Sequence, residues 1–128
     1  MNFDKRLKDL LSRGYELAQS MLESEGQIYA FGVGVRPNGN YRTIMAGDGD
    51  RHAILDALRD GLQSSQFKLT AFFEMASVED QDVTAVYLDR DGWSKLIVIP
   101  YELVDGRVVY GASTVLDNPR PLVAETRD

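Results

Sequence analysis

Hydrophobic residues near the start of the chain recur every three or four positions, which is the period of one face of an α-helix. The apolar stripe comprises Phe3, Leu7, Leu10, Leu17 and Met21. Gly14 falls inside this stripe, where it costs about 1 kcal/mol of helix propensity relative to alanine but lets another backbone approach closely. The pattern predicts an amphipathic helix of roughly twenty residues, with Gly14 as a packing notch.

From residue 28 the apolar period changes to two, as expected for a β-strand. Bulky Tyr29, Phe31, Val33 and Val35 alternate with small Ala30, Gly32 and Gly34. Because small residues let a helix lie close to a sheet, we expect helices on the small-residue face. Residues 37–40 carry turn chemistry and lead into a second strand at residues 41–46, so the two strands form a hairpin.

A second helix is predicted at residues 51–64, because Asp50 precedes an apolar periodicity and its carboxylate can accept hydrogen bonds from the first free amides. Strand patterns follow at residues 67–78, 83–89, 93–103 and 107–112. Asp91-Gly92 and Asp105-Gly106 separate the last three of these, and such pairs are typical of tight hairpins.

These elements predict an α+β fold: an antiparallel sheet of five to six strands, with an N-terminal helix and a second helix after the first hairpin. Residues 1–113 would form a single domain, and residues 114–128, with Pro119 and Pro121, an extended C-terminal tail. We expect both helices on the small-residue face of the sheet. The inward-facing positions are drawn from Phe31, Val33, Leu69, Phe73, Val83, Val86, Leu96 and Val98.

The order of helices and strands resembles that of the profilin and roadblock architectures. Their antiparallel sheet has the first and last strands of the two hairpin groups side by side in the middle. The resemblance concerns element order alone.

The composition is that of a globular domain with an acidic balance: 44% of the 128 residues are hydrophobic, 27% are charged and the net charge is −6. No cysteine is present, so the chain builds no disulfide framework, thiolate metal site or cysteine nucleophile. Charges among the first dozen residues argue against a signal peptide, and no apolar run approaches the about 20 residues that cross a bilayer. We therefore expect a cytoplasmic protein that engages neither membranes nor nucleic acid, whose phosphates its charge repels.

Three short motifs resemble functional sites but lack the context that those sites need. Gly32 and Gly34 begin a dinucleotide-binding pattern, yet they lie in a strand that leads to a hairpin rather than opening a helix. Asp48 and Asp50 begin a calcium-loop pattern whose later ligands are missing, so we interpret them as turn and helix cap. His52 is the sole histidine, and no nucleophile elbow accompanies it. The sequence predicts no catalytic residue, metal site or cofactor.

Carboxylates gather in two of the predicted turns. Glu79, Asp80 and Asp82 lie between the third and fourth strands, and Asp105 lies between the fifth and sixth. Counting turns along an antiparallel meander places both turns at the same end of the sheet, with Asp89 at the opposite end. Such an acidic rim is either a solvated edge or a surface that attracts a basic protein. We take Glu79, Asp80, Asp82 and Asp105 as candidate partner-binding residues.

Strand aromatics such as Trp93 and Tyr101 present a similar choice, because they either pack within the sheet or form a protein-binding face. Basic residues are not interleaved with them in the manner of an RNA-binding sheet.

Several short segments carry a family resemblance. They are Tyr29-Ala30-Phe31-Gly32, Asn38-Gly39, Gly47-Asp48-Gly49, Leu58-Arg59-Asp60-Gly61-Leu62, Asp91-Gly92, Ile99-Pro100-Tyr101 and Tyr110-Gly111. Over residues 29–111 the chain resembles small uncharacterised bacterial single-domain proteins, some of which look like immunity proteins of interbacterial toxin systems. The resemblance implies a cytosolic protein that neutralises a partner toxin.

The sequence thus favours a non-enzymatic, cytosolic protein-binding domain whose partner is another protein, of basic character. The alternative is a small-ligand-binding or regulatory sensor domain, since sheets of the profilin type carry pockets. Exposed strand edges would also allow two copies to pair as a homodimer.

Overall fold

The computed structural model describes residues 2–45, 50–90 and 93–118. The expectations for Asp48, for the Asp91-Gly92 turn and for Pro119 and Pro121 lie outside the described residues.

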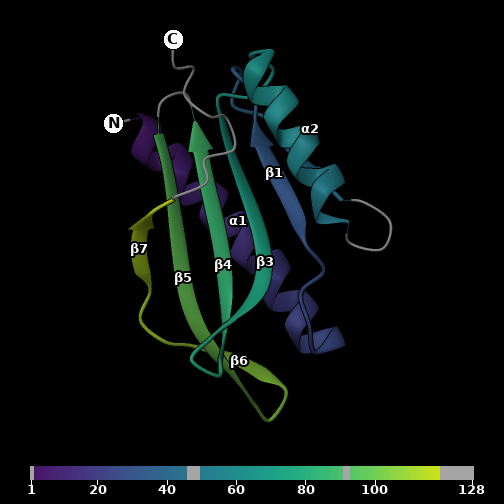
Figure 1. Cartoon of the computed structure of the whole chain (residues 1–128), viewed down its shortest axis with the longest axis vertical. Helices are drawn as coiled ribbons and strands as arrows, with labels where there is room; N and C mark the ends of the chain where they lie inside the picture. The colour runs from purple at the N-terminus through teal and green to yellow at the C-terminus, as the bar shows by residue number, and fades with distance from the viewer. Residues whose placement is uncertain (1, 46–49, 91–92, 119–128) are drawn as a thin grey trace.

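The predicted α+β element order is confirmed (Figure 1). The chain runs through α1 (Asn2–Glu25), β1 (Phe31–Val35), β2 (Tyr41–Ile44), α2 (Arg51–Gln63), β3 (Leu69–Val78), β4 (Gln81–Arg90), β5 (Trp93–Val104), β6 (Arg107–Tyr110) and β7 (Thr114–Asp117). Asp50 caps α2 as expected, because its Oδ1 accepts hydrogen bonds from the backbone N–H groups of His52 at 3.0 Å and Ala53 at 3.4 Å. Unpaired amides of the first helical turn thereby find an acceptor.

The strands form one antiparallel sheet in the order β2-β1-β3-β4-β5-β6, and β7 also pairs with β5. The neighbour of β1 is therefore β3, the first strand of the second group, so the resemblance to profilin and roadblock proteins in element order does not extend to the order of strands in the sheet. Phe67 explains the difference, since its ring packs where side chains at Gly34 and Gly61 would otherwise be. This contact anchors the end of α2 beside β1, and the next residue, Lys68, donates its N–H to Val35 O at 2.8 Å. Leu69 then begins β3 directly alongside β1.

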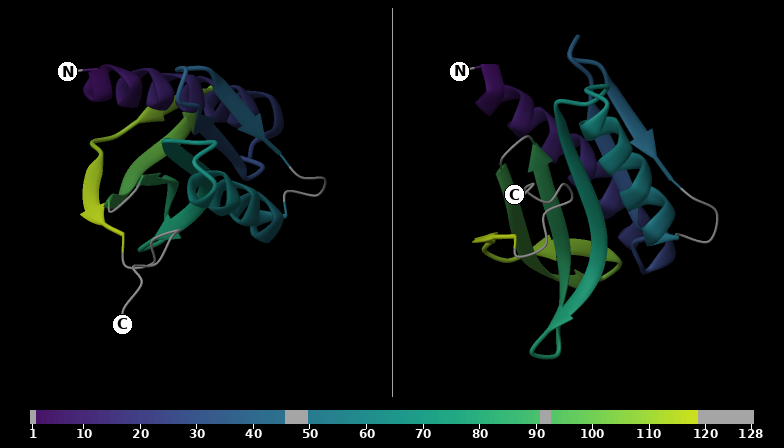
Figure 2. Two further views of the ribbon diagram at one scale, coloured as in Figure 1. Left: turned by 90° about the horizontal axis from the view of Figure 1, so that it is seen from above. Right: turned by 45° about the horizontal axis from the view of Figure 1, so that its top comes forward.

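The two helices lie on opposite faces of the sheet (Figure 2), so the expectation that both cover the small-residue face is wrong. Side chains alternate along β1, and every residue of this strand is buried. Phe31 and Val33 point into the core shared with α1, whereas Gly32 lies against Ile54 and Leu58 of α2. A strand that buries both faces needs one covering layer on each, and one helix supplies each layer.

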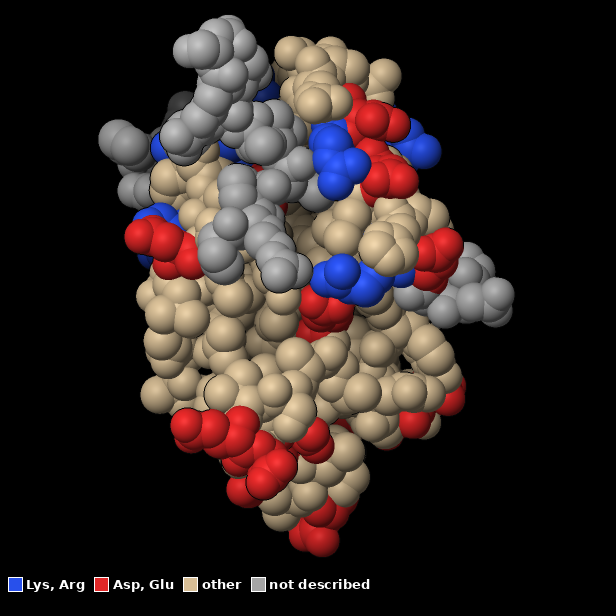
Figure 3. Space-filling view, in the orientation of Figure 1, with Lys and Arg blue, Asp and Glu red and all other residues tan. Residues whose placement is uncertain are grey.

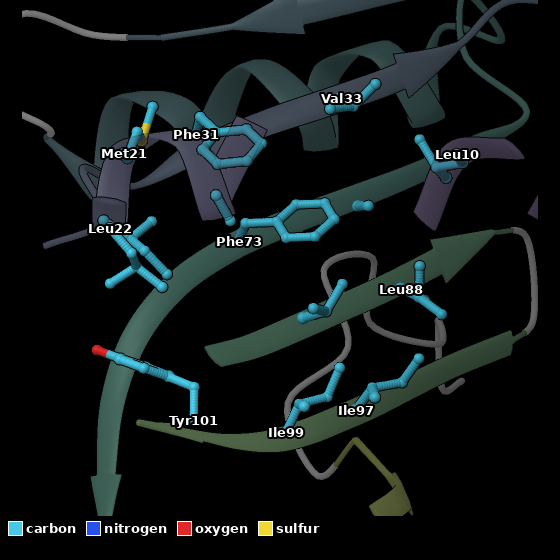
Figure 4. Packing of buried hydrophobic residues seen from close by; sticks show 14 of the residues in the cluster. Leu10, Met21, Leu22, Phe31, Val33, Phe73, Leu88, Ile97, Ile99 and Tyr101 are labelled. Carbon is cyan, nitrogen blue, oxygen red and sulfur yellow. The ribbon is translucent and has the colours of Figure 1, made fainter. Parts of the chain in front are cut away.

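The larger core fills the space between α1 and the sheet (Figure 4). Phe31 and Phe73 stack with ring centroids 4.9 Å apart, and Tyr15 meets Phe73 edge-on at 5.7 Å. Gly14 provides the space for this arrangement, because a Cβ added there would lie 1.9 Å from Cζ of Phe73. The predicted notch therefore exists, and it accommodates an aromatic ring rather than a second backbone.

The predicted inward positions divide between the two faces. Phe31, Val33, Leu69, Phe73 and Val86 belong to the α1-side core. Val83 is buried, but its register partner Ala76 and its place in the alternation put it on the α2 side. Leu96 and Val98 are half-buried on that same side of β5.

The segment expected to form an extended tail begins with β7, which pairs with Lys95 to Val98 of β5. β6 pairs with the C-terminal part of β5, so β6 and β7 follow one another along a single edge. Between them, Gly111 donates its N–H to Pro100 O at 2.8 Å. Because Pro100 has no backbone N–H, it cannot donate the reciprocal hydrogen bond to Gly111, and the ladder of hydrogen bonds is interrupted there. All residues of β7 are exposed, which explains why no alternation marked this strand in the sequence.

Candidate functional site

The four predicted partner-binding residues come together at one end of the sheet, at the bottom of Figure 3. Glu79 and Asp80 form the turn between β3 and β4, Asp82 is the second residue of β4, and Asp105 lies in the turn between β5 and β6. All four side chains are exposed. Asp89, expected at the opposite end, is there but is only 5% exposed, and its Oδ1 accepts a 2.7 Å hydrogen bond from Ser94 Oγ.

Glu102 also belongs to this end, although the sequence analysis missed it. Its backbone pairs with Val109 of β6, and the side-chain Nε2 of Gln81 donates a 3.0 Å hydrogen bond to the carbonyl of the preceding Tyr101. The signal was present in the hairpin register, because an Asp-Gly turn at residues 105–106 places residue 102 beside the turn. We call Glu79, Asp80, Asp82, Glu102 and Asp105 the acidic tip.

The two turns of the acidic tip hold their backbones in the left-handed region. Glu79 and Asp80 have φ values of 50° and 64°, and Asp105 and Gly106 have values of 53° and 79°. Two successive positive φ angles are the signature of the type I′ hairpin turn, which favours Asn-Gly and Asp-Gly. The pair Glu79-Asp80 lacks a glycine, and the long β3–β4 ladder imposes its conformation. Both carboxylates therefore lie at the turn of a long hairpin.

Replacing Glu79 and Asp80 by asparagine and glycine is expected to raise the free energy of unfolding by about 1 kcal/mol, because both residues accept positive φ more readily. Urea titration of the double variant measures the change. Asp105→Asn is the matched control, since Gly106 already occupies the second position of its turn, and it should change stability by less than about 0.5 kcal/mol. A double variant no more stable than the parent would show that the native turn is unstrained.

Exposed aliphatic side chains stand among these carboxylates. Val78 is 49% exposed, Val104 48% and Val109 54%. Val104 and Val109 lie on the face of the β5–β6 pair that carries Glu102, as the register shows. Charged groups beside a cluster of apolar groups form the chemical pattern of a protein-interaction surface more than that of a purely solvated edge.

The strand aromatics at this end contribute little to the exposed surface, although the sequence analysis considered them as a possible protein-binding face. Tyr101 is buried, and the hydroxyl of Tyr110 is inaccessible. Burial, together with the nearby Tyr110, raises the pKa of Tyr15 to about 12, so the aromatic cluster under α1 is a poorly hydrated part of the core. The exposed apolar groups at the acidic tip are thus aliphatic.

On the face drawn in Figure 3, the lower end carries Asp and Glu without Lys or Arg, whereas the upper part carries side chains of both signs. Basic residues follow the N-terminal half of α1, the β1–β2 hairpin and the strand ends at the opposite end from the acidic tip: Lys5, Arg6, Lys8, Arg13, Arg36, Arg42, Lys68, Arg90 and Lys95. The acidic tip is therefore more negative than the opposite end of the domain, and this polarity orients an approaching charged partner.

Arg107 of β6 also lies near the acidic tip, where its charge acts on Glu23 at the end of α1. The pKa of the Glu23 carboxyl is lowered, first because Oε2 accepts a 3.0 Å hydrogen bond from the N–H of Val108, then by Gln19 and by Arg107. This contact ties α1 to β6.

Among the surface hollows formed by the described residues, two lie close to features discussed above. The first, of about 240 Å³, is beside the acidic tip and is lined by Gln81, Pro100, Tyr101, Glu102, Val109, Tyr110 and Gly111. The second, of about 390 Å³, lies between β2 and α2 and is lined by Arg42, Ile44, Ala57, Asp60, Gly61, Ser64, Gln66 and Phe67.

In the described part of the chain, no group of three or more His, Cys, Asp and Glu side chains is arranged to hold a metal ion. The exposed His52 lies in the first turn of α2, where only its backbone N–H takes part in the Asp50 cap contact named above.

Comparisons of the chain with protein-family models, with curated proteins and with solved structures gave no match. Among the described residues, neither helix has the length and apolar character needed to cross a bilayer.

Proposed function

We propose that this chain is a non-enzymatic, cytosolic protein-binding domain that captures a basic partner protein with its acidic tip. The observation that carries the proposal is the placement of Val78, Val104 and Val109, all about half exposed, among the carboxylates of two hairpin turns. Carboxylates alone would be consistent with a solvated edge. Exposed aliphatic groups beside them add the apolar contact area that a lasting complex needs.

Charge and apolar surface would act at different stages of binding. The polarity of the molecule accelerates and orients the encounter with a basic surface, because the field of the acidic tip extends for about 8 Å at physiological ionic strength. The valines then exclude water and slow dissociation. The resemblance of residues 29–111 to bacterial immunity proteins extends this proposal, and a secreted toxin's basic domain would be a partner of the required charge.

The test of the proposal is a change in association kinetics. The partner is first recovered from the source organism by affinity capture and purified, and its binding is then followed at several salt concentrations. In a variant with lysine at Glu79, Asp80 and Asp82, we expect association to slow by about tenfold or more at low salt, with a weaker salt dependence.

A matched control separates the local effect from the change in net charge. Lysine substitutions at the exposed Asp9, Glu16 and Asp56 alter the net charge equally, but they lie on the helices and should slow association much less. If both triple variants associate alike, or if the lysines at the acidic tip leave the rate unchanged, the acidic tip is not the binding surface.

The hollow between β2 and α2 favours the second candidate function, a small-ligand-binding sensor. It combines the Arg42 guanidinium and the Asp60 carboxylate with the apolar ring of Phe67, and such a mixture is typical of ligand pockets. A screen of metabolites by thermal shift tests this alternative. A saturable rise in melting temperature that is lost in Arg42→Gln would favour the sensor over the protein-binding domain.

A further inference from the structure

We propose that the hollow beside the acidic tip receives one long cationic side chain, an arginine or a lysine, from the bound partner. This inference rests on the proposed function and names the anchor by which the partner is held. The hollow lies between β4, β5 and β6, and its volume is about 240 Å³.

The walls of the hollow suit the methylene stem of such a side chain. Pro100 and Val109 supply apolar surface. Gly111 has no side chain to fill the space, and a Cβ there would lie only 3.1 Å from Cγ of Pro100. Arginine and lysine bury their aliphatic stems along apolar surfaces while the charged group remains in a polar environment.

Polar groups of the hollow suit the charged end. Glu102 is exposed at its edge, and within the described ranges no ion pair to Glu102 occurs. The Nε2 of Gln81 donates to the carbonyls of Tyr101 and Asp82, at 3.0 Å and 3.2 Å. Because both bonds use the amide nitrogen, its Oε1 remains available as an acceptor. A guanidinium or ammonium group donates to both kinds of oxygen.

An apolar side chain would fit this hollow less well than a cationic one. It would remove water from the Glu102 carboxylate without offering a hydrogen bond in return, and that desolvation is costly. Arg107 lies on the same face of the β5–β6 pair as Glu102, but among the described residues the two form no ion pair. The geometry thus combines an apolar slot with an unneutralised carboxylate.

The experiment is an NMR titration of the ¹⁵N-labelled full chain with Nα-acetyl-arginine-N-methylamide and, separately, with the corresponding lysine compound. We expect saturable shifts at the Gly111 amide and the Gln81 side-chain amide with at least one of them. The citrulline analogue has nearly the same shape but no charge. Its affinity should be lower by a factor of about ten or more, because the charge-assisted hydrogen bond to Glu102 is lost.

Variants identify the groups responsible. Glu102→Gln keeps the shape of the side chain and should abolish the preference for arginine over citrulline, whereas Glu16→Gln on the exposed face of α1 should preserve it. The inference is overturned if citrulline binds as well as arginine, if the shifts are spread over all surface carboxylates, or if Glu102→Gln has no effect.

The same variants distinguish failure of this inference from failure of the proposed function. With the captured partner, Glu102→Gln should raise the dissociation rate about tenfold, while the lysine variant at Glu79, Asp80 and Asp82 slows association. If only the lysine variant has its effect, the acidic tip binds the partner and the hollow does not hold its side chain. If the lysine variant has no effect, the proposed function fails whatever the arginine probe does.

Discussion

Replacing Gly14 by alanine is expected to lower the free energy of unfolding by about 2 kcal/mol, although alanine is the better helix former by about 1 kcal/mol. The added Cβ would lie 1.9 Å from Cζ and 2.3 Å from Cε1 of Phe73. The Phe73 ring is fully buried between Phe31 and Tyr15, so it cannot move without disturbing both neighbours. Urea denaturation of the variant measures the loss.

Two further variants test whether this steric contact is the cause. Ser12→Ala, at an exposed position of the same helix, should leave stability unchanged or raise it slightly, because only helix propensity changes. Phe73→Leu shortens the side chain, and Gly14→Ala should then cost at least about 1 kcal/mol less than in the parent. If Gly14→Ala lowered the free energy of unfolding equally in the parent and in Phe73→Leu, the contact with the Phe73 ring would not be the cause.

Removing residues 1–25 is expected to abolish cooperative unfolding altogether. α1 contributes Leu10, Ala18, Met21 and Leu22 to the larger core, and all four side chains are buried. Without the helix, one face of the sheet would expose its apolar side chains to water, and several kcal/mol of burial would be lost. This loss is a large part of the free energy of unfolding of a typical domain, which is about 5–15 kcal/mol.

Circular dichroism during heating checks the truncation, and Leu22→Ala in the full chain provides a graded control. That substitution should cost about 2–5 kcal/mol while leaving the transition cooperative. If the truncated protein melted cooperatively within a few degrees of the full chain, α1 would be a detachable arm rather than part of the domain.

Local patterns in the sequence predicted most of the elements. The alternation of β1, the Asp50 cap and the Asp105-Gly106 turn each depend on residues close together in the chain. Their outcome follows from backbone stereochemistry and nearby hydrogen bonds, which need no knowledge of distant segments. The end of the sheet at which Glu79 and Asp105 lie was likewise predictable, because it follows from counting antiparallel turns.

Contacts between distant segments decided the rest. The sequence could not tell which face each helix would cover, because β1 is buried on both faces and either side accepts a helix. The strand β7 left no signal, since all of its residues are exposed and it is defined only by its pairing with β5. Glu102 joined the acidic tip through its pairing with Val109.

The sequence by itself therefore determined the α+β class, the element order and the carboxylates of the two turns, because short-range periodicity and turn chemistry encode them. Only the tertiary structure decided that β1 lies beside β3, that Gly14 accommodates the Phe73 ring, and that valines and a hollow accompany the carboxylates. These features depend on how surfaces far apart in the chain fit together. Packing selects that fit from several arrangements that the same local pattern would allow.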